Sequence, residues 1–488
     1  YETYDNCSSE IGLVVVDESG KKRVPLLPIA HTTQNVQIEI TIDMEGNFKH
    51  AELVPPEDAS TIIPCTESSS GRTSGTEPHP LCDGLQYIAA DYVAYGGSKK
   101  PDYKSYEKLL RNWCESSYSH PKAHAVLSYI SKGNVIRDLI DAQILMINKE
   151  GKLLDKWDKK LFKNAPTVKQ DSVFIRFVVW EPGNPQSSVW NDKSLHDSWI
   201  KYYTSTQGNA GLCYVLGESK PCAFQHPRFL RTSGDGAKLI SSNDKDGFTF
   251  RGRFSKASEA CGVSYEVSQK AHYALKWLIG RQGKVFYEKN SPGLTVIAWA
   301  VTGKPVPDPL NDSMDFLDFS DLPGESDIPA YTAQEFASKL NQKVAGYHAV
   351  LSAVEDIVVM AIDSATPGRM AISYYREQRA VEFLECLEKW HRNCCWMQQY
   401  YDFGKKKRFI GAPAPRIITE AAYSSNVNDK LRKSTIERLL PCIVDGRRVP
   451  RDLVETLIRR ASNRIGMKDD WEWETTLGVA CALFRKYY

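Results

Sequence analysis

The most informative part of the sequence begins at Gly211 and reads GLCYVLGESKPCAFQHPRFLRTSGDGAK over residues 211–238. Two short apolar runs on either side of a turn at residues 217–221 predict a hairpin, and His226-Pro227-Arg228 gives its exit a positive charge. Small residues let a backbone approach a ligand, and Arg and Lys side chains suit phosphate. The stretch therefore predicts a site for a polyanion, the alternative being a Gly-rich surface loop with solvated charges.

Charge counts favour the polyanion. Residues 208–290 contain 13 Lys and Arg against 7 Asp and Glu, inside a chain whose net charge is only +2. Such a local excess is where a nucleic acid docks on a nearly neutral protein. A second excess lies at residues 401–470, with 16 basic against 9 acidic residues. Any nucleic-acid site in this chain must therefore be local.

The order of elements around this stretch carries a family resemblance. After the hairpin come a Ser-Gly-x-Gly-Ala segment at residues 233–237, a helical pattern from Val263 to Leu278 and an apolar run ending at Ala300. Arg72-Thr73-Ser74-Gly75 with Leu81-Cys82-Asp83 precedes them, and a further signature with Gly446-Arg447-Arg448-Val449-Pro450 follows. In this order the segments resemble the large subunit of the type I-C CRISPR surveillance complex, Cascade.

The resemblance implies a non-catalytic subunit of an RNA-guided interference complex. Such a subunit binds double-stranded target DNA, recognises the protospacer-adjacent motif, helps to unwind the duplex, stabilises the R-loop and supports recruitment of a helicase–nuclease. Its partners would be the guide RNA and the backbone, guide 5′-end-binding and small subunits. Since residue 1 is Tyr, we expect the chain to be a fragment, lacking a C-terminal segment that resembles the small subunit.

Composition sets the class of protein. A chain of 488 residues with 42% hydrophobic and 25% charged residues predicts a globular protein of two or three domains. Its 12 cysteines show no Cys-x-x-Cys spacing, which favours free thiols in a reducing cytoplasm. No run of 18 apolar residues and no signal segment occurs, so no membrane association is expected.

Periodicity predicts an α+β fold, with strands and helices mixed in the N-terminal part and a helix-rich mixed part beyond. Expected strands are 11–16, 37–42, 48–54, 173–180, 355–361 and 370–375, and expected helices lie within 81–95, 103–131, 194–203, 379–397 and 453–464. Residues 66–80 are expected to form a loop. Five prolines fall within residues 305–329, and Asp and Glu outnumber Lys and Arg over residues 291–342. We therefore expect a DNA-recognition domain at 1–305, an acidic Pro-rich linker or loop at 306–340 and a helix-rich basic domain at 341–488.

Three groups of residues are predicted to contact DNA. Arg72, Thr73 and Ser74 are expected to read the motif together with Ser233 and Asn243, because an Arg fork reaches base edges while hydroxyls fix its register. An alternative gives Arg72 a contact with the subunit that holds the guide's 5′ end. The residues expected to neutralise phosphates are Arg231, Lys238, Lys245, Arg251 and Arg253, and those expected to guide the displaced strand or the guide are Lys405, Lys406, Lys407 and Arg408.

The sequence also bears on catalysis and metal binding. The sequence has no Walker A, His-Glu-x-x-His or Gly-x-Ser-x-Gly motif, so no catalytic residue, metal ligand or cofactor is predicted. Cys213, Cys222 and His226 lack a fourth zinc ligand, and His120 and His124 lack a third. Pro121, which stands between the two histidines, predicts a helix start there. A metal-dependent nuclease and a purely structural scaffold of a ribonucleoprotein remain the alternatives to a DNA-binding subunit.

Overall fold

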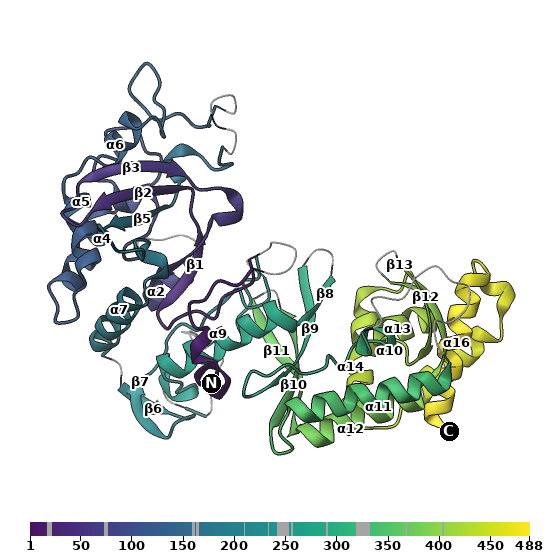
Figure 1. The fold of residues 1–488 in the computed structure, drawn as a ribbon. Helices are drawn as coiled ribbons and strands as arrows, with labels where there is room; N and C mark the ends of the chain where they lie inside the picture. Colours follow the sequence, from purple (N-terminus) through teal and green to yellow (C-terminus); the bar gives the residue numbers. More distant parts are fainter. Residues whose placement is uncertain are drawn as a thin grey trace. The chain divides into compact units, whose positions relative to one another are not determined.

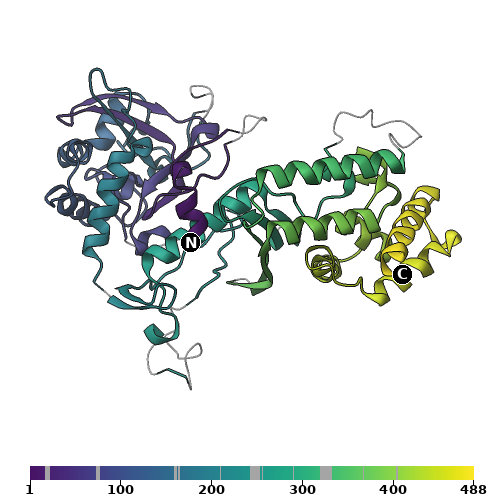
Figure 2. The same ribbon diagram turned by 60° about the horizontal axis from the view of Figure 1, so that its bottom comes forward.

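A computed structural model gives the arrangement of the chain (Figures 1 and 2). The residues that it describes are 1–16, 22–72, 77–158, 162, 165–208, 210–232, 234–241, 253–254, 257–288, 291–318, 332–366, 368–402 and 405–488. They form two compact units, which we describe separately. Unit 1 comprises residues 1, 8–228 and 240–277, and unit 2 comprises residues 2–7, 229–239 and 278–488.

The central sheet of unit 1 has the strand order β3-β2-β5. Strand β2 (Ile38–Asp43) pairs antiparallel with β3 (Phe48–Leu53) and parallel with β5 (Ile175–Trp180). Ile38, Ile40 and Ile42 alternate along β2 and are fully buried, as expected of a strand with one covered face. The β2–β3 turn needs Gly46, because its φ is +78° and a Cβ there would lie 2.7 Å from the carbonyl oxygen of Ala125.

Helices α4 (Tyr103–Cys114) and α5 (Pro121–Ser131) pack on each other, and α5 contacts β2 and β5 (Figure 1). Their apolar faces, with Tyr106, Trp113 and Tyr129, form one core with the sheet. The other elements of unit 1 are shorter: β1 (His31–Asn35) paired with β4 (Ser60–Pro64), α2 (Glu67–Ser70), α3 (Leu85–Ile88), α6 (Val135–Asp141), α7 (Lys193–Thr206), β6 (Ala210–Cys213) paired with β7 (Glu218–Pro221), and α8 (Ala257–Ala260). Helix α9 (Tyr265–Gln282) belongs to unit 1 up to Trp277.

The sheet of unit 2 has the order β11-β10-β9-β8 and is antiparallel throughout. Its strands are β8 (Lys284–Glu288), β9 (Ser291–Ala300), β10 (Asp356–Thr366) and β11 (Arg369–Arg379). Helices α11 (Ala333–Val350) and α12 (Ala380–Asn393) run side by side (Figure 2). Phe383, Leu384 and Trp390 of α12 are fully buried in the core that these elements share.

A two-stranded sheet and the remaining helices complete unit 2. Strand β12 (Trp396–Asp402) pairs antiparallel with β13 (Lys405–Gly411), and α16 (Asp470–Tyr487) packs on β12. Gly478 permits this close approach, because a Cβ there would lie 2.5 Å from the Met397 carbonyl oxygen. The other helices of unit 2 are α1 (Glu2–Asn6), α10 (Ser313–Phe316), α13 (Pro415–Tyr423), α14 (Asp429–Val444) and α15 (Arg451–Ala461).

Two short segments join unit 2 out of sequence order. Helix α1 does so through Thr3, whose hydroxyl accepts a 3.1 Å hydrogen bond from the Trp299 indole, 296 residues away. Residues 229–239 do so through Lys238, whose N–H donates to the Gly368 carbonyl and whose carbonyl accepts from the Met370 N–H. These pairings attach part of the central basic stretch to the sheet of unit 2.

The α+β fold predicted from the sequence is confirmed. The strands expected at 37–42, 48–54, 173–180, 355–361 and 370–375 correspond to β2, β3, β5, β10 and β11. The expected buried strand at 11–16 is wrong, since no strand forms there and Leu13 to Val16 are 42–54% exposed. The loop expected at 66–80 contains α2, because Thr66 and Ser69 form a reciprocal capping box.

The domain division drawn from the sequence stays a prediction. The two units divide the chain differently from it, since β9 and β10 pair across the expected linker at 306–340. Residues 319–331 of that linker lie outside the described residues, and α10 and the start of α11 fall within the rest. Across the described ranges, we find no helix long and apolar enough to cross a membrane.

Candidate nucleic-acid interface

Arg72 does not extend into solvent but forms a buried ion pair. Its Nη1 and Nη2 atoms donate to the two carboxylate oxygens of Asp83 at 3.0 and 2.5 Å, and its guanidinium lies 4.3 Å from the centroid of the Tyr87 ring. The Asp83 side chain is fully buried and that of Arg72 is 10% exposed. Burial lowers the pKa of Arg72, but the hydrogen bonds that it donates to Asp83 and the negative charge of that carboxylate outweigh burial, so the pKa lies above its ordinary value.

Arg72 also connects the residues on either side of segment 73–76, which contains two of the other predicted motif readers, Thr73 and Ser74. Its Nη1 donates to the Glu77 carbonyl oxygen at 2.5 Å, while its backbone N–H donates to Ser69 at the end of α2. Asp83 in turn accepts the His79 and Gly84 N–H groups, both at 2.7 Å. The ion pair thus fixes the residues that flank 73–76. Thr73 and Ser74 lie outside the described residues.

This region contacts the exit of the central hairpin. Glu67 Oε1 accepts the backbone N–H groups of Phe224 and Gln225 at 2.7 and 2.6 Å. The Arg228 guanidinium packs against Gly71, where a Cβ would lie 3.0 Å from Arg228 Nε. The N-terminal signature and the first part of the central stretch, more than 150 residues apart, are therefore one site. The sequence analysis did not predict that Glu67 and Arg228 make the contacts that join these segments, although it placed Arg228 at the exit of the hairpin.

Arg231 is buried in unit 2. Its Nε donates to Asp235 at 2.7 Å, Nη1 to the Gly293 carbonyl and Nη2 to the Ser364 hydroxyl, both at 2.6 Å. Its side chain is 1% exposed, so in this conformation it connects residues 229–239 to β9 and β10 and offers no donor to DNA. Lys238 is half-buried in the same segment, and Arg253 is exposed. Ser233, Asn243, Lys245 and Arg251 lie outside the described residues.

The cationic run at 405–408 is the start of strand β13, so its side chains alternate between two faces. Lys407 points inward with Phe409 and binds Asp312 at 3.0 Å and Asp315 at 2.7 Å. The Lys407 side chain is 11% exposed and the Asp312 side chain is fully buried. Lys406 and Arg408 belong to the opposite face, where they pair across the strands with Tyr401 and Gln399. The Lys405 side chain lies outside the described part.

Lys406 stands in an aromatic setting. Its Nζ lies 4.9 Å from the ring centroid of Trp471 in α16, and that ring lies 5.0 Å from the ring of Tyr401. The Tyr401 side chain is 56% exposed. We call these three residues the Tyr401 cluster. An accessible aromatic ring beside a cation is the combination that stacks bases and holds phosphates of single-stranded nucleic acid. Trp471 is 65 residues from Lys406, and no sequence pattern connected the two.

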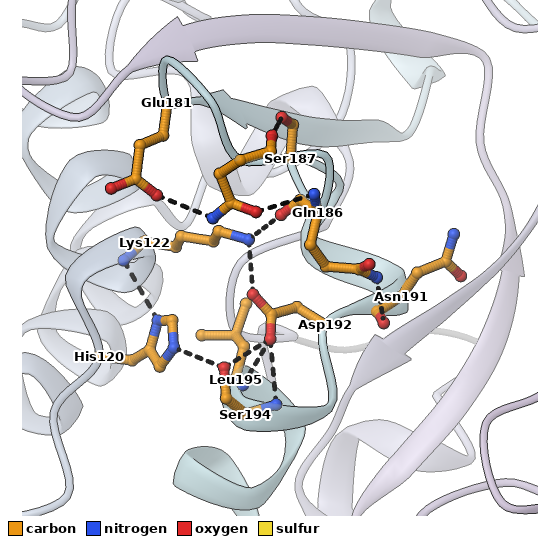
Figure 3. A network of polar contacts seen from close by, with 10 residues as sticks. His120, Lys122, Glu181, Gln186, Ser187, Asn191, Asp192, Ser194 and Leu195 are labelled. Atoms are coloured by element: carbon orange, nitrogen blue, oxygen red, sulfur yellow. Dashed lines mark hydrogen bonds and ion pairs between the residues drawn. The ribbon is translucent and has the colours of Figure 1, made fainter.

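A polar network in unit 1 resembles a Ser–His–Asp arrangement (Figure 3). Ser194 Oγ donates to Asp192 at 2.6 Å, and His120 Nε2 lies 3.1 Å from Ser194 Oγ. His120 Nδ1, however, accepts the Lys122 N–H, so the neutral ring carries its proton on Nε2 and donates to Ser194. Such a histidine takes no proton from the serine. Burial also lowers the pKa of His120, which keeps the ring neutral.

The network instead caps two helices. His120 is the N-cap of α5, and Asp192 caps α7 by accepting the Ser194 and Leu195 N–H groups. Lys122, whose side chain is 5% exposed, binds Asp192 at 2.5 Å and the Gln186 carbonyl oxygen. The helix start predicted at Pro121 is confirmed. No cluster of three His, Cys, Asp or Glu suited to a metal occurs among the residues with assigned positions, and all 12 cysteines are free thiols.

Comparison with known proteins gives the family. The model of a family described as CRISPR-associated protein (Cas_Csd1) matches residues 1–488. The chain belongs to this CRISPR-associated family. No curated protein matches the sequence. The family match supports an assignment to CRISPR systems of the Cascade type, and it covers both the Arg72 region and the Tyr401 cluster.

Proposed function

We propose that this Cas_Csd1 chain is the large subunit of a type I-C Cascade. In this proposal it binds double-stranded target DNA, recognises the protospacer-adjacent motif, helps to open the duplex, stabilises the R-loop and supports docking of a helicase–nuclease. Guide RNA and the backbone, guide 5′-end-binding and small subunits are its partners, in the cytoplasm. The observation that carries the proposal is the family match over the whole chain.

The geometry changes the roles proposed for individual residues. Arg72 becomes a positioning residue, because Asp83 and Glu77 occupy three of its five N–H donors. Motif reading is then assigned to the loop that Arg72 closes, which contains Thr73 and Ser74. In such complexes base pairing reads the sequence, whereas the protein reads a short motif and the backbone. Direct binding, without catalysis by this chain, accounts for both tasks.

The Tyr401 cluster is proposed to hold the displaced strand. Lys406 and Arg408 belong to the face of β13 opposite Lys407, beside Tyr401, and cations in this setting bind phosphates without reading sequence. Lys407 is excluded from that role because Asp312 and Asp315 bind its ammonium group.

The test is binding of the assembled complex to duplexes with a correct and an altered motif, using Lys406→Glu with Arg408→Glu. The charge reversal should weaken binding to both duplexes by the same factor. Lys389→Glu combined with Arg392→Glu on α12 changes the net charge equally and serves as the matched control. A metal-dependent nuclease would instead cleave the substrate, and chelation by EDTA would stop it. Unchanged binding by the double variant, or a loss confined to one motif, would contradict backbone contact at this cluster.

A further inference from the structure

Unit 1 contains a cavity of about 280 Å³ that has no part in the proposed function. It is lined by β1, by α3 and by the residues that precede β5. Among its lining residues are Gln34, Arg72, Tyr87, Lys99, Asp171 and Phe174. We call it the Arg72 cavity. Its volume lies just below the range of about 300–1,000 Å³ that is typical of pockets for drug-sized ligands. A single planar ring system is therefore a suitable occupant, and two stacked ones are not.

Some of the lining groups are fixed by the protein itself. Asp171 accepts the Ser98 N–H and hydroxyl at 2.9 and 2.5 Å and the Ser172 hydroxyl at 2.8 Å. Burial raises the pKa of Asp171, but these hydrogen bonds outweigh it and hold the pKa below its ordinary value, so the group is a carboxylate. Arg72 is fixed by Asp83 and covers Tyr87. The walls of the cavity are thus preorganised.

Other lining groups have capacity left. Within the part of the chain that the structure describes, the Gln34 amide makes no hydrogen bond, and the Lys99 ammonium group makes no ion pair. Gln34 is half-buried and Lys99 is exposed, which places a neutral amide deeper in the cavity than the cation. The Phe174 side chain is half-buried and lines the same cavity. The cavity therefore presents an amide that can both donate and accept, an aromatic ring and, nearer solvent, a positive charge.

This combination selects among ligand classes. A free phosphate would use Lys99 but neither the amide nor Phe174, and an aliphatic ligand would leave the Gln34 amide unpaired. A metal ion does not fit, because no group of three candidate ligands occurs among the described residues. A nucleobase fits each part, since a base turned out of its stack is recognised by hydrogen bonds to its edge and by aromatic contact.

We propose that the Arg72 cavity receives one unstacked nucleobase, with Gln34 and Asp171 facing its hydrogen-bonding edge, Phe174 its ring, and Lys99 its phosphate. The inference rests on the proposed function, which supplies the nucleic acid. The base can come from the guide RNA or from a target strand, since both present the same chemistry. In this arrangement Arg72 shapes a pocket for a single base and does not itself enter a groove of the duplex.

The test is photocrosslinking of the complete chain to short single-stranded oligonucleotides that contain one 4-thiouracil, in separate RNA and DNA series. Near-ultraviolet light joins this base to whatever side chain it contacts, and peptide mass spectrometry locates the bond. We expect a crosslinked peptide that contains Tyr87 or Phe174. Crosslinking by RNA alone would identify the guide as the source, and crosslinking by DNA alone would identify a target strand.

Two variants of lining residues and two control variants of their sequence neighbours test whether the crosslink depends on the cavity. Gln34→Leu and Lys99→Ala should each lower the yield of that peptide by about 2- to 10-fold, the value of one hydrogen bond or ion pair. Asn35→Ala and Lys100→Ala alter the adjacent residues, which do not line the cavity, and should leave the yield unchanged. Crosslinks only to other peptides, or equal yields from all four variants, would overturn the proposal.

A parallel binding assay separates this proposal from the proposed function. If the assembled complex prefers the correct duplex motif but no crosslink reaches Tyr87 or Phe174, the cavity proposal alone fails. If the crosslink forms but motif preference is absent, the cavity proposal stands and the proposed function fails. If the chain binds neither oligonucleotide nor duplex, both fail.

Discussion

Arg72 in unit 1 and the cations of strand β13 in unit 2 were all predicted from the sequence to contact nucleic acid, but their surroundings in the structure differ. Arg72 is directed inward by Asp83, which is fully buried only 11 residues away. Along β13 the direction alternates, since Lys407 binds the buried Asp312 while Lys406 lies beside the accessible Tyr401. A cation that is bound by a buried carboxylate is therefore a poor candidate for nucleic-acid binding.

The largest effect is expected at the Arg72–Asp83 pair. Replacing Arg72 with Ala should lower the free energy of unfolding by about 3–5 kcal/mol, because Asp83 is left as an uncompensated buried charge. Denaturant unfolding of the complete chain measures the loss. Arg253→Ala, at an exposed position, should change stability by less than about 0.5 kcal/mol.

A double-mutant cycle sharpens this result. Arg72→Ala combined with Asp83→Ala should cost clearly less than the sum of the two single changes, because the second substitution removes the charge that the first exposes. Additive losses would mean that the two side chains do not depend on each other, and the contrast with Lys406 would lose its physical basis.

A smaller loss is expected at Lys407. Lys407→Ala should lower the free energy of unfolding by about 1.5–3 kcal/mol, the range for hydrogen bonds to charged groups. The loss is smaller than at Arg72 because Asp312 still accepts from the Tyr400 hydroxyl and the Asp315 N–H. Lys406→Ala, one residue earlier on the opposite face, should be nearly neutral in the same denaturation experiment. Equal losses at 406 and 407 would contradict the alternation.

Acidic pH should destabilise unit 1 more than unit 2. Burial is the main cause that lowers the pKa of His31, His79 and His196 in unit 1 and of His391 in unit 2, with values of about 4 for His196 and about 3 for His391. Because the folded pKa lies below the unfolded value, the unfolded chain binds protons first. Stability is therefore complete above about pH 6.5 and falls as the pH approaches the folded pKa, by about 1 kcal/mol per histidine at pH 5.5.

Unfolding measured at pH 7.5 and 5.5 checks this expectation, with hydrogen exchange to locate the opening. Unit 1 should lose more protection than unit 2, and His196→Gln should reduce the pH dependence of unit 1. A chain whose stability is the same at both pH values would show that these histidines are not held neutral.

The smallest effect concerns the salt dependence of binding. Lys406→Ala should lower the log–log slope of single-stranded DNA affinity against salt by about 0.7, the contribution of one phosphate contact. Lys407→Ala should leave the slope unchanged, provided that the variant is assayed where it is folded. Equal changes in slope would place Lys407 on the phosphate-binding face and remove the distinction between the two lysines.

Sequence patterns predicted those parts of the fold in which the pattern is local. The alternation of Ile38, Ile40 and Ile42 with polar residues correctly predicted β2, and Pro121 correctly predicted the start of α5. The prediction of a buried strand at Ile11 to Val16 was wrong because apolar composition indicates burial but does not show which element of the fold would cover the strand. The capping box at Thr66 was readable in principle and was missed because Ser69, and not Glu or Gln, stands at its third position.

The candidate site was harder to predict for a physical reason. Asp83 appears in the same signature as Arg72, so their pairing lay within reach of sequence reasoning. Lys407 is neutralised by Asp312, 95 residues earlier in a segment that its composition marked as a linker. Glu67 contacts Phe224 and Gln225 across more than 150 residues. Contacts of this range are set by the packing of the whole unit and leave no periodic trace in the sequence.

The hydrogen bond between Thr3 and Trp299 has a consequence for the synthesis of the protein. A ribosome adds about 5–20 residues per second, so the partner of Thr3 is made about 15–60 s after Thr3 itself. During that interval most of unit 1 has been translated and can fold, while the first helix still lacks its binding surface. Helix α1 therefore reaches this contact only after residue 299 has been made, and slowing translation before Trp299 should prolong the susceptibility of α1 to protease in nascent chains.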